Sequence, residues 1–202
     1  MKKQISFQVT GNKIPLDHRY FLHSAIKKEF QKGIPGFDFG TSLINSIPGM
    51  LSMGMWLKIT PKSTFQARVE ESELAMWETL NEKRLNIGGS FVQLSNPVVK
   101  DITSAQQLTS AMVLFHCGKQ KLKNDIPNVE MFLASCYKAL GKLDIKASVK
   151  MGELRKFKCK GRNQLGYKVE LFDLSEDDSI KVKSLGLGGS RRFGCGWFND
   201  KL

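Results

Sequence analysis

Apolar and polar positions follow strand-like or helix-like spacing in a series of segments along the first half of the chain. Residues 5–9 alternate and predict a strand, because successive side chains of a strand face opposite sides. Pro15 and Asp17 predict the start of a helix, with the proline at its entry and the aspartate as its cap, and this helix extends to about Phe30. Residues 33–53 are rich in glycine, proline and serine and predict a long loop.

The remainder of the first half continues with strands and one further helix. Residues 55–60 and 64–69 predict a hairpin that turns at residues 61–62, where a proline is followed by a lysine. Residues 70–81 predict a helix whose acidic first turn suits the helix dipole. A strand follows over residues 90–102 and is irregular in its second part.

The second half opens with the same kinds of element. Residues 111–115 predict a strand, and residues 119–124 predict a basic loop. Asn128 predicts the N-cap of a helix that reaches Leu140 and is closed by Gly141, since asparagine is a favoured cap and glycine a favoured helix end.

Strands dominate the rest of the second half. Residues 145–150 and 154–160 predict a second hairpin, with its turn at the glycine between them. Residues 167–172 predict another strand, and residues 175–184 predict a short helix. A glycine-rich loop then leads into residues 195–198, which predict the last strand.

Each half therefore predicts the order strand, helix, strand, strand, helix, strand, with an extra hairpin in the second half. This is the order of the ferredoxin-like fold. We predict an α+β protein of two tandem ferredoxin-like (βαββαβ) domains, over residues 1–104 and 108–202. The duplication is inferred from element order, because the two halves share no visible residue-level repeat.

The charge of the chain favours a polyanionic partner. Its 202 residues include 31 Lys and Arg against 19 Asp and Glu, a formal net charge of +12. Nucleic acid is the commonest such partner, and a membrane surface is the competing interpretation. The hydrophobic fraction of 41% is ample for a core, and no apolar run reaches the ~18 residues that cross a bilayer.

Metal and cofactor chemistry are not expected. Cys117, Cys136, Cys159 and Cys195 form no C-x-x-C pair, so they indicate reduced thiols in a cytoplasmic protein rather than a zinc site or disulfide framework. No carboxylate cluster has the spacing of a metal site, which argues against two-metal nuclease chemistry. The chain also lacks the P-loop and dinucleotide-binding fingerprints.

Positive charge is concentrated between residues 146 and 168, where eight basic residues stand against one acid, Glu153. On the predicted strand, alternation places Lys156, Lys158 and Lys160 on one face. Such a ladder can follow a phosphate backbone, with Arg155 and Arg162 beside it. The alternative is a solvated strand edge that is kept charged against aggregation.

The most distinctive segment is the glycine-rich loop near the end of the chain, which carries two adjacent arginines. Glycine lets backbone N–H groups approach an anion, and arginine offers a planar fork to phosphate. We expect the loop to bind RNA phosphates through Gly186, Gly188, Gly189, Ser190, Arg191 and Arg192.

Two of the three histidines lie in the first predicted helix and are candidates for acid–base catalysis. Helical spacing places His23 between Arg19 and Lys27 on a basic face, and neighbouring cations favour a neutral imidazole. His18 lies in the first turn, where the helix dipole has the same effect. Tyr20 is a candidate for positioning the phosphate, and Lys27 for stabilising charge on it.

The role of each histidine has a structural alternative. For both first-helix histidines, the alternative is a structural or solvated side chain without a catalytic role. His116 follows a strand with a buried pattern, so a structural role is favoured for it.

Two motifs resemble a known family. Residues 14–26 resemble the first-helix signature of the CRISPR-associated repeat-processing endoribonucleases, the Cas-six family of the RAMP superfamily. Residues 186–198 resemble the glycine-rich motif of the same family, and residues 166–169 and 174–179 resemble the segment that leads into it. The resemblance touches both ends of the chain.

The resemblance implies two ferredoxin-like domains and recognition of CRISPR repeat RNA, often as a stem-loop. It implies metal-independent cleavage by attack of the 2′-hydroxyl, with a cyclic or 3′-phosphate product that stays bound and joins other CRISPR effector subunits. Many members carry a histidine just after the first helix, whereas residues 33–42 contain none.

This departure leaves three possibilities open for the chemistry. His18 or His23 takes the role, basic residues act through charge alone, or the protein binds repeat RNA without cutting it. A more distant alternative is a general RNA-binding protein without preference for a repeat sequence.

Overall fold

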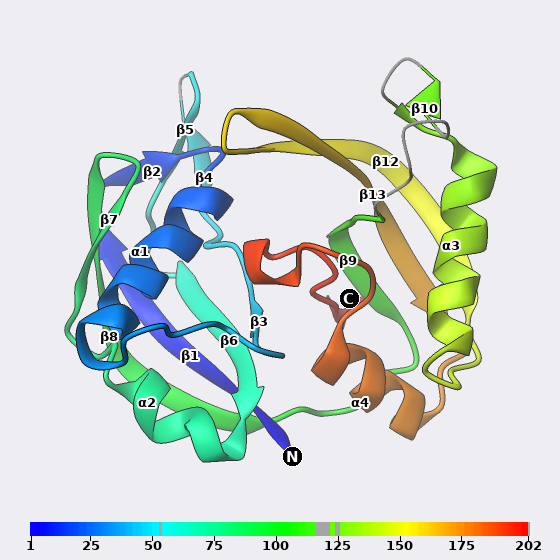
Figure 1. Cartoon of the computed structure of the whole chain (residues 1–202), viewed down its shortest axis with the longest axis horizontal. Helices are drawn as coiled ribbons and strands as arrows, with labels where there is room; N and C mark the ends of the chain where they lie inside the picture. Colours follow the sequence, from blue (N-terminus) through cyan, green and yellow to red (C-terminus); the bar gives the residue numbers. More distant parts are fainter. Residues whose placement is uncertain (53, 116–121, 124–125, 202) are drawn as a thin grey trace. The chain divides into compact units, whose positions relative to one another are not determined.

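The computed structural model describes residues 1–52, 54–115, 122–123 and 126–201. The chain divides into two compact units, Met1–Asp101 and Ile102–Leu202, which are described separately. Each unit has its own hydrophobic cluster, and each contains one main antiparallel sheet. Figure 1 gives the labels of the elements.

The first unit is built on a five-stranded antiparallel sheet with the order β3-β6-β1-β8-β7. Alternation along β1 buries Ile5, Phe7 and Val9 on one face, as the sequence predicts. The strands are β1 (Lys2–Gly11), β3 (Leu43–Ile44), β6 (Thr64–Glu70), β7 (Arg84–Ile87) and β8 (Ser90–Asp101).

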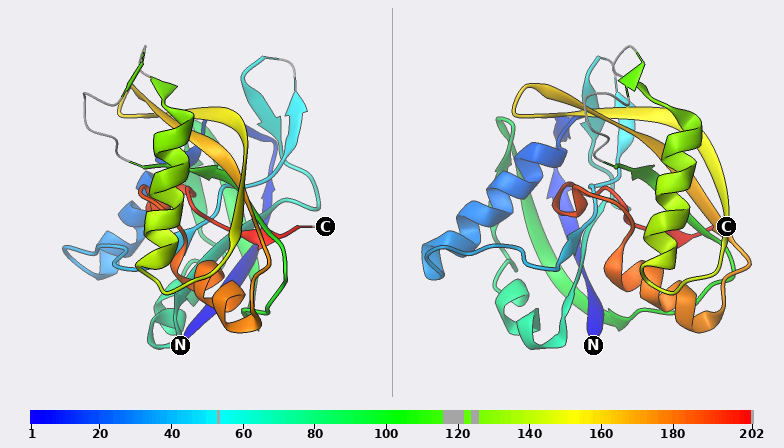
Figure 2. Two further views of the ribbon diagram at one scale, coloured as in Figure 1. Left: turned by 90° about the vertical axis from the view of Figure 1, so that its right-hand side faces the viewer. Right: turned by 45° about the vertical axis from the view of Figure 1, so that its right-hand side comes forward.

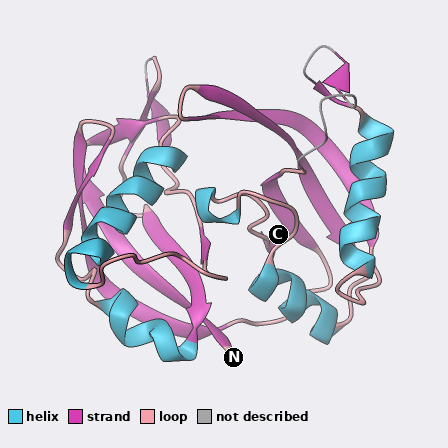
Figure 3. Cartoon of the chain, in the orientation of Figure 1, coloured by secondary structure: helices cyan, strands magenta, loops and turns pink. Residues whose placement is uncertain are grey.

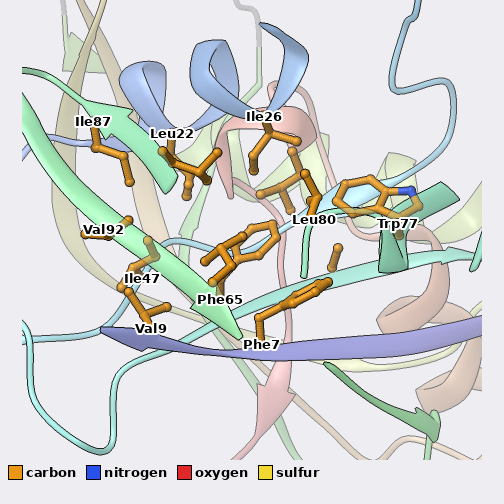
Figure 4. Packing of buried hydrophobic residues seen from close by; sticks show 14 of the residues in the cluster. Phe7, Val9, Leu22, Ile26, Ile47, Phe65, Trp77, Leu80, Ile87 and Val92 are labelled. Atoms are coloured by element: carbon orange, nitrogen blue, oxygen red, sulfur yellow. The ribbon is translucent and has the colours of Figure 1, made fainter. Parts of the chain in front are cut away.

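Two helices cover the buried face of this sheet (Figure 3). They are α1 (Arg19–Gly33) and α2 (Leu74–Glu78), the second preceded by a 3-10 turn over Glu71–Glu73. Figure 4 shows Leu22 and Ile26 of α1 pointing at Phe65 and Val92 of the strands below. The buried stripe of α1 thus fastens the helix to the sheet.

A smaller sheet, with the order β2-β5-β4, accompanies the first unit. Its strands are β2 (Lys13–Pro15), β4 (Met50–Ser52) and β5 (Trp56–Lys58). Ile14 of β2 is buried, and Leu57 of β5 packs against the core of the unit. This sheet overturns two predictions for the first half.

The predicted hairpin over residues 55–60 and 64–69 is wrong. The turn exists, with the Ser63 N–H donating to the Thr60 carbonyl, but β5 pairs with β2 and β4 whereas β6 pairs with β1 and β3. Burial decides the pairing: Phe65, Ala67 and Val69 of β6 are completely buried and require a central position. The predicted loop over 33–53 is also corrected, since it contains β3 and β4.

The sequence interpretation missed β7 altogether. This strand forms a hairpin with β8, and the register of β1 against β8 shifts between Ser6 and Gln8. The shift accounts for the irregular pattern after residue 94, because a bulge breaks strict alternation.

The second unit has a four-stranded antiparallel sheet with the order β12-β13-β9-β14. Helix α3 lies along β12 (Figure 2). The strands are β9 (Leu108–Val113), β12 (Ser148–Cys159), β13 (Arg162–Phe172) and β14 (Asn199–Asp200), and the helices are α3 (Val129–Gly141) and α4 (Glu176–Leu185). A short pair, β10 (Leu122–Lys123) with β11 (Ile126–Pro127), precedes α3.

The predicted Asn128 cap is confirmed, and the structure adds a cap by Ser175 at the start of α4. The Asn128 side chain accepts a hydrogen bond from the Met131 N–H, and the Ser175 side chain accepts one from the Asp178 N–H. Each such cap stabilises its helix by about 1 kcal/mol.

Two strand predictions for this unit are wrong. Residues 145–150 and 154–160 do not form a hairpin: residues 148–159 are the single strand β12, and Gly152 lies at a shift of its register against β13. A glycine within a strand permits such a bulge as well as a turn. The last strand is Asn199–Asp200 rather than residues 195–198, and residues 119–121 and 124 of the predicted basic loop lie outside the described residues.

Both units follow the ferredoxin-like order. In the first, β1, α1, β3, β6, α2 and β8 supply the six elements, with β7 and the small sheet as additions. In the second, the six elements are β9, α3, β12, β13, α4 and β14. The predicted α+β fold with tandem ferredoxin-like domains is confirmed.

Candidate active site and nucleic-acid interface

His18 is buried at the start of α1, with only 3% of its surface exposed. It is the N-cap residue and makes no capping hydrogen bond through its side chain, so the prediction that Asp17 caps the helix is wrong. The helix begins one residue too late for Asp17 to reach the free N–H groups of its first turn.

Both ring nitrogens of His18 are hydrogen-bonded to the backbone. Nε2 accepts from the Ile47 N–H at 3.0 Å, so Nδ1 carries the proton and donates to the Pro15 carbonyl at 3.1 Å. Burial, reinforced by the charge of Arg19, lowers the pKa of His18 to about 4. The ring is therefore neutral at pH 7 and fastens the segment at Ile47 to the start of the helix.

His23 does not lie on a basic face, contrary to the sequence prediction. It belongs to the buried face of α1 and is 9% exposed, with its ring centroid 4.7 Å from that of Phe39. The side chains of Leu22, Ile26 and Phe30 complete this face, while Phe21 is 41% exposed. A helix facing a sheet buries a stripe at i, i+3, i+4 and i+7, and His23 falls within it.

Tyr20 and Lys27 flank His23 on α1, three residues before it and four after it, and both are partly buried. The Tyr20 ring makes an edge contact with that of Phe21 at 6.0 Å. Helical spacing therefore brings Tyr20 and Lys27 to the same side of α1 as His23, whereas His18, the N-cap residue, does not share that side.

The segment after α1 is part of the core rather than a free loop. Phe37 and Phe39 are buried, and their rings contact Phe30 at 4.6 Å and Trp77 at 6.2 Å, respectively. Such aromatic contacts contribute about 0.5–1.5 kcal/mol each beyond the area they bury. This packing explains why a region rich in glycine and proline is folded.

In the glycine-rich loop, glycine serves close packing of the backbone. A Cβ on Gly188 would lie 2.5 Å from the Leu114 carbonyl oxygen, and one on Gly196 would collide with the Leu187 carbonyl oxygen. Both residues also have positive φ values, +81° and +68°. A side chain is therefore excluded at either position on two grounds.

Several amide groups of this loop are already bonded within the protein. The Gly189 N–H donates to the Leu114 carbonyl at 2.7 Å, and the Gly196 N–H donates to the Met112 carbonyl at 2.7 Å. The Gly186 N–H donates to the Val182 carbonyl at 2.8 Å and so ends helix α4. The loop is a folded support at the end of β9, and these three groups are not presented to an external anion.

The two arginines of the loop lie in a 3-10 turn, Arg191–Phe193, and differ in their contacts. Arg191 Nη1 donates to the Leu185 carbonyl at 2.7 Å, which ties it to the end of α4. The Arg192 guanidinium lies over the Phe193 ring, 5.3 Å from its centroid, and its side chain is exposed. Arg192 is thus the arginine that the turn offers to a ligand.

The basic ladder is confirmed in part. On β12, Lys156 and Lys158 are exposed and Phe157 between them is buried. Lys160 has left the strand and occupies the turn into β13 with φ +49°. Arg155 is exposed and forms an ion pair with Glu153 at 2.7 Å, and Arg162 is exposed at the start of β13.

The ladder and the arginine turn lie on opposite sides of β12. Phe157 points away from the lysines and contacts Phe193 of the turn, with ring centroids 6.0 Å apart. An RNA that contacts Lys156 or Lys158 together with Arg192 therefore crosses the edge of the sheet, where β12 is the outermost strand.

A buried lysine in α4 has no counterpart in the sequence interpretation. Lys183 donates to the Thr103 carbonyl at 2.6 Å and to Asp200 Oδ1 at 2.5 Å, and so joins α4 to β14 and to the segment before β9. Thr103 and Asp200 are 80 and 17 residues from Lys183 in the sequence, so the spacing of residues could not have predicted these contacts.

Within the described part of the chain, no three histidine, cysteine, aspartate or glutamate side chains are grouped to hold a metal ion. Nor does any helix there have both the length and the apolar character needed to cross a membrane.

Comparison with known proteins gives matches that span the chain. The "CRISPR-associated endonuclease Cas6" of Myxococcus xanthus is 27% identical over 195 residues, covering 95% of this chain and 78% of that protein. Among solved structures, a "CRISPR associated protein Cas6" superposes with a TM-score of 0.75 at 12% identity and full coverage of both chains. A Cas6-related protein from Pyrococcus furiosus gives 0.70 at 12% identity, with 98% of each chain covered.

The structural matches have low identity and therefore establish the shared fold alone. The sequence model of the Cas6 family, described as "Cas6 Crispr", matches residues 4–201. Because this match spans nearly the whole chain, the protein belongs to the Cas6 family.

Proposed function

We propose that this protein is an endoribonuclease that binds CRISPR repeat RNA and cleaves precursor transcripts into guide RNAs. The observation that carries the proposal is the family match over residues 4–201. The net charge of +12 and the exposed cations of the second unit agree with an RNA substrate.

The proposed reaction needs no metal ion. A general base removes the proton of a ribose 2′-hydroxyl, and the resulting oxygen attacks the adjacent phosphorus. The bond from phosphorus to the 5′-oxygen breaks, and a general acid returns a proton to that oxygen. The products are a 2′,3′-cyclic phosphate and a 5′-hydroxyl, and cations stabilise the charge that develops on the phosphoryl oxygens.

His23 is our candidate for the general base or acid. It is more exposed than His18, and both ring nitrogens of His18 are already hydrogen-bonded to backbone groups. We assign His18 to positioning α1, and Tyr20 and Lys27 to the phosphate. Our candidates for binding the RNA are Arg192 of the glycine-rich loop and, on β12, the following turn and the start of β13, Lys156, Lys158, Lys160 and Arg162.

Single-turnover cleavage of the repeat RNA encoded beside the gene, in EDTA, tests the proposal. We expect cleavage to continue in EDTA and to stop when the RNA carries a 2′-deoxy substitution at the cut site. Cleavage of the 2′-deoxy RNA would contradict attack by the 2′-hydroxyl, and dependence on added metal would contradict a metal-independent mechanism.

The two arginines of the turn offer a matched pair of variants. We expect Arg192→Ala to weaken RNA binding about tenfold, because a charge-assisted contact with phosphate is lost. Arg191→Ala removes the same charge, but the contact that it loses is the internal one to α4. It should therefore lower the stability of the second unit more than the affinity for RNA. An equal loss of affinity for both variants would refute the division between them.

Burial of both α1 histidines favours one second candidate, a subunit that binds repeat RNA without cutting it. Tight binding of the repeat RNA with no cleavage in any buffer would select this candidate. In either case we propose that the protein stays on its RNA and joins other CRISPR effector subunits, which co-purification with the processed RNA would test.

A further inference from the structure

The outward face of the small sheet β2-β5-β4 in the first unit carries two lysines opposite each other. Lys13 of β2 and Lys58 of β5 are cross-strand partners, and both side chains are exposed. Like charges directly opposite in a sheet destabilise the pair. None of the ion pairs of the described residues involves either lysine. The arrangement is unfavourable in isolation and becomes favourable when an anion lies between the two ammonium groups.

An aromatic ring lies beside the two lysines. Trp56 shares the face of Lys58, because the two are separated by one residue on β5, and the Lys13 Nζ lies 4.4 Å from the Trp56 ring centroid. Trp56 is partly exposed, whereas Trp77 and Trp197 are buried. The indole therefore offers a planar surface at the solvent boundary, next to two uncompensated positive charges.

Apolar side chains border this surface. Met50 of β4, the cross-strand partner of Lys58, is 62% exposed, and Met55 just before β5 is 68% exposed. β4 and β5 project beyond the five-stranded sheet of their unit (Figure 2). A ligand that fits here combines a flat apolar group with a negative charge. A nucleotide has both, whereas an acidic peptide segment supplies the charge without the plane.

We propose that Lys13, Trp56 and Lys58, here called the Lys–Trp platform, bind an unpaired segment of RNA. A base stacks on Trp56, and a phosphate lies between Lys13 and Lys58, drawing the Lys13 ammonium from the ring. The segment is unpaired because the bases of a duplex are stacked on one another and leave no face for an indole. The proposal rests on the proposed function and adds a contact made by residues of the first unit.

The test uses two RNAs, the repeat stem-loop alone and the same stem-loop with its unpaired flanks, and measures affinity over a range of salt. For the flanked RNA, we expect Lys13→Ala/Lys58→Ala to reduce the magnitude of the slope of log affinity against log salt by about 0.7, the value for one phosphate contact on a single strand. Trp56→Leu should weaken binding about tenfold without changing this slope. The stem-loop alone should bind all variants as it binds the wild type.

A matched control removes the same charge from elsewhere in the unit. Lys28 and Lys83 are exposed, and Lys28→Ala/Lys83→Ala should leave the slope unchanged. A second readout is tryptophan fluorescence, which the flanked RNA should quench in the wild type and not in Trp56→Leu, because the other two tryptophans are buried.

Three results would overturn the platform. One is an unchanged slope in Lys13→Ala/Lys58→Ala, which would assign the face to a different anionic partner, such as an acidic protein surface. Another is an equal change of slope in Lys28→Ala/Lys83→Ala, which would show that the effect depends on the net charge of the protein and not on the position of the lysines. The third is equal weakening for both RNAs. If the wild type does not cleave the RNA but the variants show these binding effects, the proposed catalytic function is contradicted and the platform stands.

Discussion

Replacing His18 by phenylalanine tests whether this histidine holds the fold or performs acid–base chemistry. Phenylalanine keeps a ring of similar volume and removes both nitrogens, so the Ile47 N–H and the Pro15 carbonyl lose their partner. A buried backbone group without a hydrogen bond costs about 1–3 kcal/mol. We therefore expect His18→Phe to lower the free energy of unfolding of the first unit by about 2–3 kcal/mol at pH 7.5.

The pH dependence distinguishes this reasoning from a simple packing defect. The folded-state pKa of His18 is lowered from 6.5 to about 4, so between these values the unfolded chain binds a proton that the folded chain does not. The stability that neutral His18 contributes is complete above pH 6.5 and is lost as the pH falls towards 4. The wild type should lose about 2.5 kcal/mol by pH 4.5, since one pKa unit corresponds to about 1.4 kcal/mol.

Hydrogen–deuterium exchange of peptides from the first unit, measured between pH 7.5 and 4.5, provides the free energies separately from the second unit. The difference between the wild type and His18→Phe should narrow by about 2–3 kcal/mol over this range. Titration of the other histidines cancels in the difference. A constant difference would refute the role assigned to His18. A variant of full stability that no longer cleaves RNA would show that His18 takes part in the chemistry.

Two further predictions concern the second unit. Gly196→Ala should destabilise it by about 3 kcal/mol or more, because the new methyl group meets the Leu187 carbonyl and φ is positive. Gly141→Ala, at a helical position with open space around it, is the control in thermal unfolding and should not destabilise; equal melting temperatures of the two variants would contradict the packing role of the loop. Lys183→Ala should cost about 2 kcal/mol, less than a fully buried pair because Asp200 is half exposed. Lys146→Ala, at an exposed position, is the control for Lys183→Ala, and urea unfolding measures the free energy of unfolding of both variants. An equally small loss in the two variants would show that the link from α4 to β14 does not contribute to stability.

The sequence alone determined the ferredoxin-like order of elements, the Asn128 cap of α3 and the sign of the partner's charge. Local chemistry suffices for these: Asn128 accepts a hydrogen bond from an N–H three residues away, and β1 alternates within its own length. The family resemblance likewise came from contiguous motifs at the two ends of the chain. The alternation that exposes Lys156 and Lys158 also follows from the strand itself.

Tertiary structure decided which strands pair and which side of α1 faces the core. Residues 55–60 and 64–69 have a hairpin signature, yet burial of Phe65, Ala67 and Val69 places β6 beside β1. His23 lies within helical reach of both cations and apolar residues, and only the sheet below α1 selects its buried face. The division between Arg191 and Arg192 and the facing of Lys13 by Lys58 depend on contacts between segments distant in sequence, for which periodicity carries no information.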